Sequence, residues 1–410
     1  SYKMTKPQSI GKVQRELITA HYQRANEAKA EGKPVVYVTA MFPVEIVKAF
    51  EPHLATVYPE NHAALLISRG LAEDLASKAT VGAHLDKMGC AYELVNTGYL
   101  LQPESALVDA KGRPISKLPE PDVLLACDNQ CRVVSEWFAN LGKLFDATAY
   151  SVNVGDNYTG EESSRKTTYI RGQLEHVIAF LEEKTGTDLN QDKLLEVARQ
   201  SNSAVKLWRE YLELGKLTPS PVTSFDGFFH MAPIVSERGT QQAVDYYQQL
   251  LNETDVNEGA VQPEKHRLLW DNLATWFNFG ELKRYFSDRN IAVVGSTYLD
   301  VWKKELDTTS YDTLLDSMAE AYGTMYTNQT MDQRIDLWKE MVRSHRAEGI
   351  LFHDNRSCHT FSLRQREIAK ALKEEFGNQF RTIHFEGDQG LKERFQETSL
   401  KTKVETYFCD

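Results

Sequence analysis

Long apolar runs are absent from this sequence. No stretch of its 410 residues approaches the roughly 20 consecutive apolar residues that a membrane helix needs. Residues 1–9 also lack the apolar segment of a secretory signal. We therefore expect a cytoplasmic protein that has no membrane partner.

The glycine-rich motifs of several common enzyme classes are absent too. Without GxxxxGK the chain itself is not expected to bind ATP, and without GxGxxG it is not expected to bind NAD. Without GxSxG a serine hydrolase would have no nucleophile elbow. Acidic residues outnumber basic ones, 58 to 47, and the formal net charge is -11. This balance argues against a nucleic-acid surface, and it leaves room for a local basic pocket that binds a phosphorylated ligand.

Cysteine is scarce and scattered. Five cysteines in a cytoplasmic chain of this length are too few for a disulfide framework. The CxxxC pair of Cys127 and Cys131 has no second CxxC or HxxxH partner, so none of the usual zinc spacings is present. Metal binding and free thiols both remain open at this point.

What the sequence does contain is a repeated pattern of strand, loop and helix. The length and the 41% hydrophobic content predict two domains, each with a sizeable core. Short apolar runs of strand type occur at 35–39, 56–58, 122–126 and 147–154, and again at 268–270, 291–294, 350–352 and 382–385. The pattern predicts an α/β fold with two parallel-sheet, Rossmann-like (flavodoxin-like) domains.

Helical periodicity separates the two sets of strands. Residues 10–30 are predicted to form an exposed helix, and apolar residues at helical spacing continue through 174–215 and 241–251. We therefore predict an N-terminal helix with a first α/β domain over 1–155, a helical segment over 156–260 and a second α/β domain over 261–410.

The loop after the run at 350–352 carries Cys358, at the carboxyl end of a predicted strand. Ser362 and Gln365 have the spacing of a capping box at the start of a helix, which Gly377 is expected to end. Cys131 follows the run at 122–126 in the same way. In parallel sheets these positions border the ligand-binding crevice.

Glu60 and His62 follow the run at 56–58, and either one is able to move protons. Alternatives remain open for both: Glu60 caps a helix or pairs with an arginine, and His62 lies on the surface or supports a neighbouring residue. Arg356 orients a carbonyl group or a cluster sulfur, or bridges two loops.

Three aromatic residues, Trp270, Trp276 and Phe277, line a flat pocket or belong to the core. The sequence by itself does not decide between these two alternatives.

Five segments together resemble one protein family. They are AMFP at 40–43, YPENHAA at 58–64, CDNQC at 127–131, PSPVTSFDGF at 219–228 and NRSCH at 355–359. In this order they are similar to the benzoyl-CoA reductase and 2-hydroxyacyl-CoA dehydratase family, and the similarity covers nearly the whole chain.

The resemblance implies a 4Fe-4S cluster held between the two α/β domains. Its cysteine ligands fall on Cys90 in GCAY, Cys131 and Cys358, with Cys127 as the competitor of Cys131. Helix N-termini beside cysteines favour the thiolate form. An iron without a thiolate can act as a Lewis acid. Five cysteines predict one cubane in this chain, because a double cubane would need about six thiolates, and we expect Cys409 to be an ordinary thiol.

The resemblance also implies the activity. We expect a subunit of an oxygen-sensitive, ATP-dependent aromatic acyl-CoA reductase of the benzoyl-CoA type, an oxidoreductase of anaerobic aromatic degradation. In it, Glu60 and His62 would be catalytic, and Asn355 and Arg356 would bind substrate. The implied partners are a homologous second subunit in a heterodimer, an ATP-hydrolysing iron–sulfur activator and an acyl-CoA thioester.

Two alternatives stay open. One is a subunit of an (R)-2-hydroxyacyl-CoA dehydratase, a lyase that works through a ketyl radical, and the other is a non-catalytic electron-transfer or scaffold subunit. Ala40 favours the reductase, since dehydratase relatives can carry a hydroxyl residue there.

Overall fold

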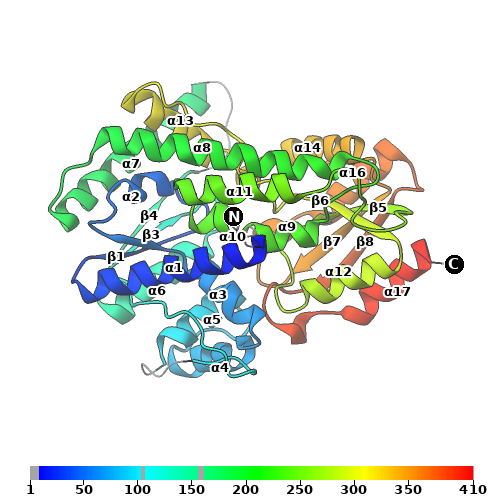
Figure 1. Cartoon of the computed structure of the whole chain (residues 1–410), viewed down its shortest axis with the longest axis horizontal. Helices are drawn as coiled ribbons and strands as arrows, with labels where there is room; N and C mark the ends of the chain where they lie inside the picture. The colour runs from blue at the N-terminus through cyan, green and yellow to red at the C-terminus, as the bar shows by residue number, and fades with distance from the viewer. Residues whose placement is uncertain (1–8, 103–106, 156–160, 410) are drawn as a thin grey trace, which may run out of the picture.

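The structure is a computed structural model that describes residues 9–102, 107–155 and 161–409. Within these residues the chain forms two separate four-stranded sheets, and every strand pairing is parallel. The sheets lie towards opposite ends of the molecule, with helices around and between them (Figure 1). This confirms the predicted α/β class and its two parallel sheets.

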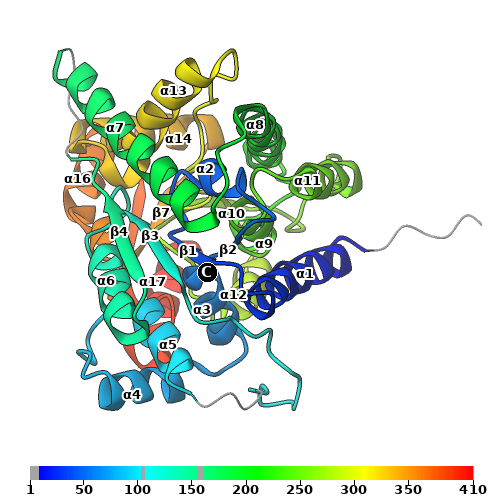
Figure 2. The same ribbon diagram turned by 90° about the vertical axis from the view of Figure 1, so that its left-hand side faces the viewer.

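The first sheet has the strand order β2-β1-β3-β4. Its strands are β1 (Val35–Val38), β2 (Ala55–Val57), β3 (Val123–Cys127) and β4 (Thr148–Val152). All residues of β1, β2 and β3 are buried, as expected for parallel strands covered on both faces, whereas β4 at the edge is largely accessible. Figure 2 shows this sheet from its side, with α5 and α6 on one face and α2 and α7 on the other.

Six helices belong to this first part of the chain: α1 (Ile10–Ala30), α2 (Val44–Lys48), α3 (Pro59–Ser68), α4 (Ala72–Gly82), α5 (Ala91–Leu100) and α6 (Val133–Phe145). The prediction that residues 10–30 form a helix is confirmed. The prediction that this helix is exposed is wrong for one of its faces. His21, Tyr22 and Ala25 are buried there, because α1 packs on β2, α10 and α11.

The helical stretch between the sheets consists of α7 (Glu161–Thr185), α8 (Gln191–Glu213), α9 (Ser224–His230), α10 (Ala232–Ser236) and α11 (Gln241–Glu253), with a 3-10 turn η1 (Leu214–Lys216). Helices α8 and α11 pack along each other through Trp208 and Tyr247, whose rings are 5.2 Å apart. They run beside both sheets (Figure 1). The predicted domain boundaries are not tested by these positions and stay a prediction.

The second sheet has the order β6-β5-β7-β8. Its strands are β5 (His266–Asp271), β6 (Ile291–Ser296), β7 (Gly349–Asn355) and β8 (Arg381–Gly387). The helices that follow β5 in the chain are α12 (Phe279–Asp288), α13 (Tyr311–Gly323), α14 (Met331–His345), α15 (His359–Ser362), α16 (Gln365–Phe376) and α17 (Glu397–Phe408), with 3-10 turns η2 (Tyr326–Asn328) and η3 (Lys392–Arg394). Of these, α13 packs on α7 rather than on the second sheet. Each of the eight predicted strand runs overlaps one of the strands observed in the described residues.

The capping box predicted from Ser362 and Gln365 is wrong. Ser362 ends α15, and its hydroxyl donates to the carbonyl of Cys358, 2.8 Å away. Helix α16 begins after Arg364, which adopts a left-handed conformation with φ 61°, and Gln365 donates to the carboxylate of Asp271. The tertiary contacts of these two polar side chains outweigh the local capping pattern. Gly377 ends α16 as predicted, with φ 95°.

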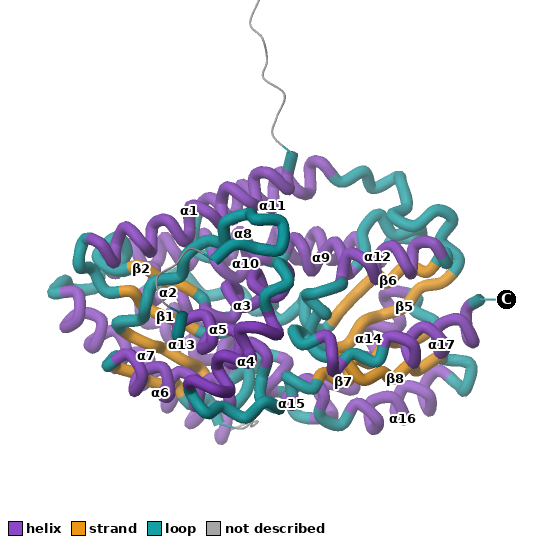
Figure 3. The backbone as a smooth tube through the Cα atoms, turned by 90° about the horizontal axis from the view of Figure 1, so that it is seen from below, coloured by secondary structure: helices purple, strands orange, loops and turns teal. Residues whose placement is uncertain are grey.

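A buried polar contact ties the end of the first sheet to the second part of the chain. Asn129, in the loop after β3, donates from Nδ2 to the carbonyl groups of Met41 and Tyr322, both at 2.9 Å. Thr327 in η2 donates to the carbonyl of Asn129 at 2.8 Å. Helices α3, α5, α10 and α15 lie between the two sheets (Figure 3). None of the helices in the described residues combines the length and the apolar composition of a membrane span.

Candidate active site

The carboxyl ends of strands from both sheets open onto one cavity of about 610 Å³. In sheets of this strand order, ligands bind where the order reverses, which here is between β1 and β3 and between β5 and β7. Ala40 follows β1, Cys131 follows β3, Trp276 follows β5 and Cys358 follows β7, and all four line the cavity. Its volume falls within the roughly 300–1,000 Å³ of typical small-molecule sites. This cavity is the candidate active site.

Three of the five cysteines line the cavity: Cys90, Cys131 and Cys358. Cys90 precedes α5 directly, Cys358 precedes α15 directly, and Cys131 lies one residue before Arg132, which precedes α6. Their sulfur atoms accept hydrogen bonds from backbone N–H groups in the first turns of these helices. The donors are Tyr92 and Glu93 for Cys90, Val133 and Val134 for Cys131, and Phe361 for Cys358.

The three thiols share one electrostatic neighbourhood. Burial raises the pKa of Cys131 and of Cys358 to about 12 and raises the pKa of Cys90 still further above its usual value. The thiols also act on one another through charge. Cys131 raises the pKa of Cys90, Cys358 raises the pKa of Cys131, and Cys90 raises the pKa of Cys358. Each thiol is therefore close enough to disfavour a charge on another. Without a positive group between them, the three stay protonated.

These residues fit an iron–sulfur cluster better than a single metal ion. In the described part of the chain, no three His, Cys, Asp or Glu side chains are close enough to hold one ion together. Three thiols spread around one wide cavity suit a larger inorganic group, and cysteine thiolates are the usual ligands of such clusters. A bound cation reverses the effect of burial, since a coordinating thiol loses its proton.

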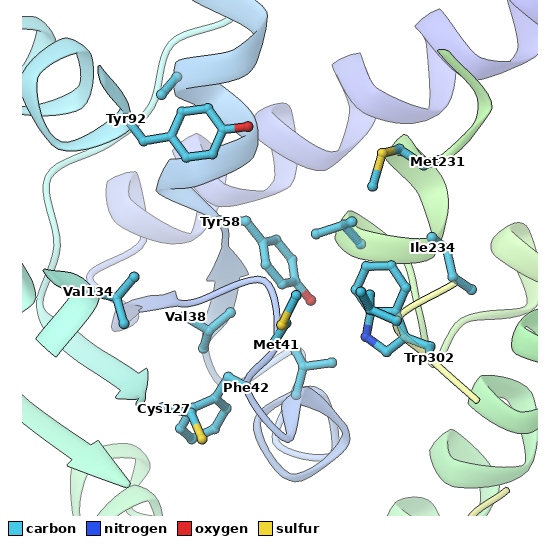
Figure 4. Close-up of a cluster of buried hydrophobic side chains, with 14 of the residues drawn as sticks. Val38, Met41, Phe42, Tyr58, Tyr92, Cys127, Val134, Met231, Ile234 and Trp302 are labelled. Carbon is cyan, nitrogen blue, oxygen red and sulfur yellow. The ribbon is translucent and has the colours of Figure 1, made fainter. Parts of the chain in front are cut away.

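The other two cysteines lie elsewhere. Cys127 is the last residue of β3 and is fully buried. Figure 4 shows its side chain beside Phe42, in a cluster of apolar residues. Cys409 follows α17. Neither borders the cavity in the described structure, so of the pair in CDNQC only Cys131 reaches it.

Glu60 lies in the first turn of α3 and borders the same cavity. Its Oε1 accepts a 2.7 Å hydrogen bond from the backbone N–H of Ala40, and its Oε2 accepts one of 2.9 Å from Nε2 of Gln130. Burial raises the pKa of Glu60, and these two hydrogen bonds offset part of that increase. Its charge also raises the pKa of Cys131 and Cys358. The carboxyl group is thus buried, oriented and close to the thiols.

The structure does not bring His62 to the cavity. Its ring packs against Tyr22 and Tyr99, with ring centroids 5.2 and 4.6 Å away, and its Nε2 donates to the carbonyl of Ser116 at 2.8 Å. Burial lowers the pKa of His62 to about 4, so the imidazole is neutral near pH 7. Its environment is that of a core histidine.

Asn355 and Arg356 do not border the cavity either. The amide of Asn355 is buried and donates to Asn272 and Gln389, at 3.2 and 2.9 Å. Gln389 in turn donates to the sulfur of Cys90 at 3.7 Å, so Asn355 supports the loops around two of the cysteines. Arg356 points to solvent and pairs with Glu386 at 2.7 Å.

Of the three aromatic residues singled out in the sequence, one lines the cavity. Trp276 lines the cavity, whereas Trp270 is completely buried in the core and Phe277 packs against Phe395 outside it. The additional aromatic lining residues are Tyr22, Tyr92, Trp137, Phe228, Phe229, Phe279, Tyr298, Trp302 and Phe361. Tyr298 follows a predicted strand, which was the signal in the sequence that could have identified it.

The chain is similar to known proteins over nearly its whole length. The family model described as "2-hydroxyglutaryl-CoA dehydratase, D-component" matches residues 39–408. The chain is 29% identical over 397 residues to the (R)-2-hydroxyisocaproyl-CoA dehydratase alpha subunit of Clostridioides difficile, covering 95% of this chain and 93% of that protein. It is 29% identical over 401 residues to the (R)-phenyllactyl-CoA dehydratase alpha subunit of Clostridium sporogenes, with coverage of 95% and 93%.

A third relative carries the name of a different reaction. The chain is 26% identical over 411 residues to a benzoyl-CoA reductase subunit of Thauera aromatica, covering 96% of this chain and 93% of that protein. The family resemblance expected from the five sequence segments is confirmed, since the matching family model spans nearly the whole chain. This chain belongs to the family of the 2-hydroxyglutaryl-CoA dehydratase D-component, which includes subunits of 2-hydroxyacyl-CoA dehydratases and of benzoyl-CoA reductase.

Proposed function

We propose that this chain is a subunit of an enzyme that removes water from a 2-hydroxyacyl-CoA thioester. The observation that carries the proposal is the cavity in which Cys90, Cys131, Cys358 and Glu60 meet. The relatives support a dehydratase more than the reductase that the sequence motifs favoured. The two dehydratase alpha subunits are each 29% identical to this chain, whereas the reductase subunit is 26% identical.

In this proposal Cys90, Cys131 and Cys358 hold a 4Fe-4S cluster between the two α/β parts. Such a cluster supplies a low-potential electron and, at an iron without a thiolate, a Lewis acid. The relatives are themselves named as subunits, which supports a second subunit here. The absence of a Walker motif in this chain supports a separate ATP-hydrolysing activator as the electron source.

Glu60 is the proposed proton donor. Dehydration breaks the bond between C2 and its hydroxyl oxygen and removes a proton from C3, and the leaving hydroxyl needs a proton to depart as water. A buried carboxyl with a raised pKa can supply that proton. Gln130 and the N–H of Ala40 fix its position. His62, Asn355 and Arg356 do not reach the cavity, so we assign them supporting roles outside it.

The apolar lining of the cavity serves the same chemistry. Phe228, Trp276, Phe279 and Phe361 form an aromatic part of its wall. They exclude water from the acyl group, which strengthens every hydrogen bond made inside and protects reactive intermediates.

A second candidate is the reduction of an aromatic acyl-CoA. It is favoured by the aromatic residues in the lining, which suit a ring, and by the similarity to the benzoyl-CoA reductase subunit. In that reaction the carboxyl of Glu60 would protonate the ring. A non-catalytic subunit would instead have no use for an oriented, buried carboxyl beside the three thiols.

Electron stoichiometry tests the proposal. The chain, its partner subunit and the activator are purified without oxygen and supplied with either a 2-hydroxyacyl-CoA or an aromatic acyl-CoA. A dehydratase should form many molecules of enoyl-CoA per electron supplied, whereas a reductase consumes electrons with every product. Electron use in proportion to product would transfer the assignment to the reductase. Full activity of the Cys358→Ser variant would remove both candidates and leave a scaffold role.

A further inference from the structure

Tyr298 presents its hydroxyl group to the candidate active site. It lies two residues after β6, is partly exposed and lines the cavity. Its ring is held by Phe361, Phe228 and Trp276, with ring centroids 6.1, 6.3 and 6.4 Å away. These contacts fix the ring, so the phenol oxygen has a defined position.

A directed chain of hydrogen bonds leads to this oxygen. The indole N–H of Trp276 donates to the hydroxyl oxygen of Tyr92 at 2.6 Å. The Tyr92 hydroxyl hydrogen-bonds to that of Tyr298. An indole is only a donor, so Tyr92 accepts from it and keeps its own proton. The hydrogen bond from Tyr92 lowers the pKa of Tyr298, which is the effect of a donor on the phenol oxygen that it contacts. The proton of Tyr298 is then left for an acceptor in the cavity.

Two other hydroxyl groups that line the cavity are already engaged. Ser357 donates to the carboxylate of Asp388 at 2.7 Å, and Thr327 donates to the carbonyl of Asn129 at 2.8 Å. None of the hydrogen bonds found among the described residues uses the Tyr298 proton. The Tyr298 hydroxyl is therefore available as a donor to a ligand in the cavity.

Tyr298 lies close to the side chains that are proposed to act on the substrate. Tyr298 lies within electrostatic range of both Glu60 and Cys358. Burial, more than these charges, raises its pKa, so the phenol stays neutral and remains a donor near pH 7.

We propose that the Tyr298 hydroxyl donates a hydrogen bond to the thioester carbonyl oxygen of the bound acyl-CoA. Tyr92 and Trp276 act as positioning residues. This inference rests on the proposed function and holds for both candidate reactions, since an electron added to the acyl thioester puts negative charge on that oxygen. A preoriented donor in a largely apolar cavity stabilises this charge.

The test compares ligands that differ only at the carbonyl group. Anaerobic calorimetry measures binding of benzoyl-CoA and 4-methylpentanoyl-CoA to the complex with its partner subunit. It also measures the matching thioethers, S-benzyl-CoA and S-(4-methylpentyl)-CoA, which lack the oxygen. Tyr298→Phe should weaken thioester binding by about threefold to tenfold, the usual effect of one hydrogen bond, and leave thioether binding unchanged. Tyr92→Phe should give a smaller loss of the same kind, and the exposed Tyr169→Phe none.

Two results would overturn the role of Tyr298 and leave the proposed function intact. Equal weakening of thioester and thioether binding in Tyr298→Phe would assign the residue to packing, and unchanged binding of both would remove it from the carbonyl site. If the parent complex binds none of the four ligands, the proposed function itself fails, and this inference fails with it.

Discussion

Gln130 donates a hydrogen bond of 2.9 Å from Nε2 to Oε2 of Glu60, and the next residue in the chain is Cys131. The proposed proton donor and a proposed cluster ligand are therefore held by one loop. The position of the carboxyl group therefore depends on the conformation of the loop that carries the thiol. In the proposed function this loop would couple proton supply to the cluster site.

Iron content should separate the cysteines into two groups. Replacing Cys90, Cys131 or Cys358 by Ser should remove most of the roughly four irons that a cubane provides per chain. Cys127→Ala and Cys409→Ser should retain them, because neither thiol borders the cavity. Iron and acid-labile sulfide are measured after anaerobic reconstitution. Full iron in Cys358→Ser would exclude it as a ligand.

Glu60→Gln should lower turnover by roughly 10²-fold or more, the usual scale for loss of a general acid, while folding and iron content stay unchanged. The control is Asp128→Asn, which removes another carboxyl with a raised pKa, after β3 but outside the cavity lining, and should keep parental turnover. A Gln variant with parental turnover and an intact cluster would make Glu60 structural.

The pH dependence of turnover should carry the signature of Glu60. Burial raises its pKa, so the carboxyl keeps its proton to a higher pH than a free glutamic acid does. If the protonated form is the donor, turnover is high below the pKa of Glu60 and declines as the pH rises through it. This alkaline decline should disappear from the residual activity of Glu60→Gln. Its persistence there would assign the decline to another group.

Glu237 should stabilise the fold in a defined pH range. Burial alone would raise its pKa, but the charges of Lys48, His21 and Arg24 lower it to about 2. Because its folded pKa is depressed, its contribution is fully present above about pH 4.5, the ordinary value, and is lost as the pH falls towards 2. Glu237→Gln should cost roughly 3 kcal/mol at pH 7, as expected when one partner of a buried ion pair is removed.

Thermal unfolding of Glu237→Gln at pH 7 and pH 3 measures the difference, which should be smaller at the lower pH. The exposed Glu16→Gln, which breaks a 3.8 Å surface pair with Lys12, should leave the melting temperature nearly unchanged. If Glu237→Gln lowered the melting temperature equally at both pH values, the charge of Glu237 would not be what stabilises the fold.

Two glycines should respond to alanine with opposite signs. A Cβ at Gly98 would lie 1.8 Å from the carbonyl oxygen of Leu75, where α5 packs against α4, so Gly98→Ala should destabilise the fold by roughly 1–3 kcal/mol or more. Gly172, inside α7, has open space around it, and Gly172→Ala should stabilise by roughly 0.5–1 kcal/mol. Denaturant unfolding of both variants provides the check, and a stable Gly98→Ala would show that the two helices can separate.

Much of the fold could be predicted from the sequence because buried parallel strands are continuous apolar runs. The runs at 35–39 and 350–352 illustrate this, since each coincides with a fully buried stretch of β1 or β7. The capping box predicted at Ser362 and Gln365 was wrong, because a side chain that can cap a helix can also hydrogen-bond to a distant residue. Gln365 bonds to Asp271 in this way.

The candidate site was harder to predict from sequence. The side on which a residue of a short helix faces is set by packing: Glu60 and His62 are two residues apart, yet only Glu60 meets the cavity. Tyr298 and Gln130 gained their importance from contacts with residues far along the chain, Tyr92 and Glu60, which no local pattern contains.

The distribution of the three cavity cysteines also constrains how the protein is made. Cys90 and Cys131 are synthesised with the first sheet, whereas Cys358 is synthesised only after β7, near the end of the second sheet. During translation, the emerging first half can offer at most two of the three proposed ligands. A cluster held by all three cysteines, as proposed, would therefore gain its third ligand only once β7 has been made and the second sheet has folded against the first.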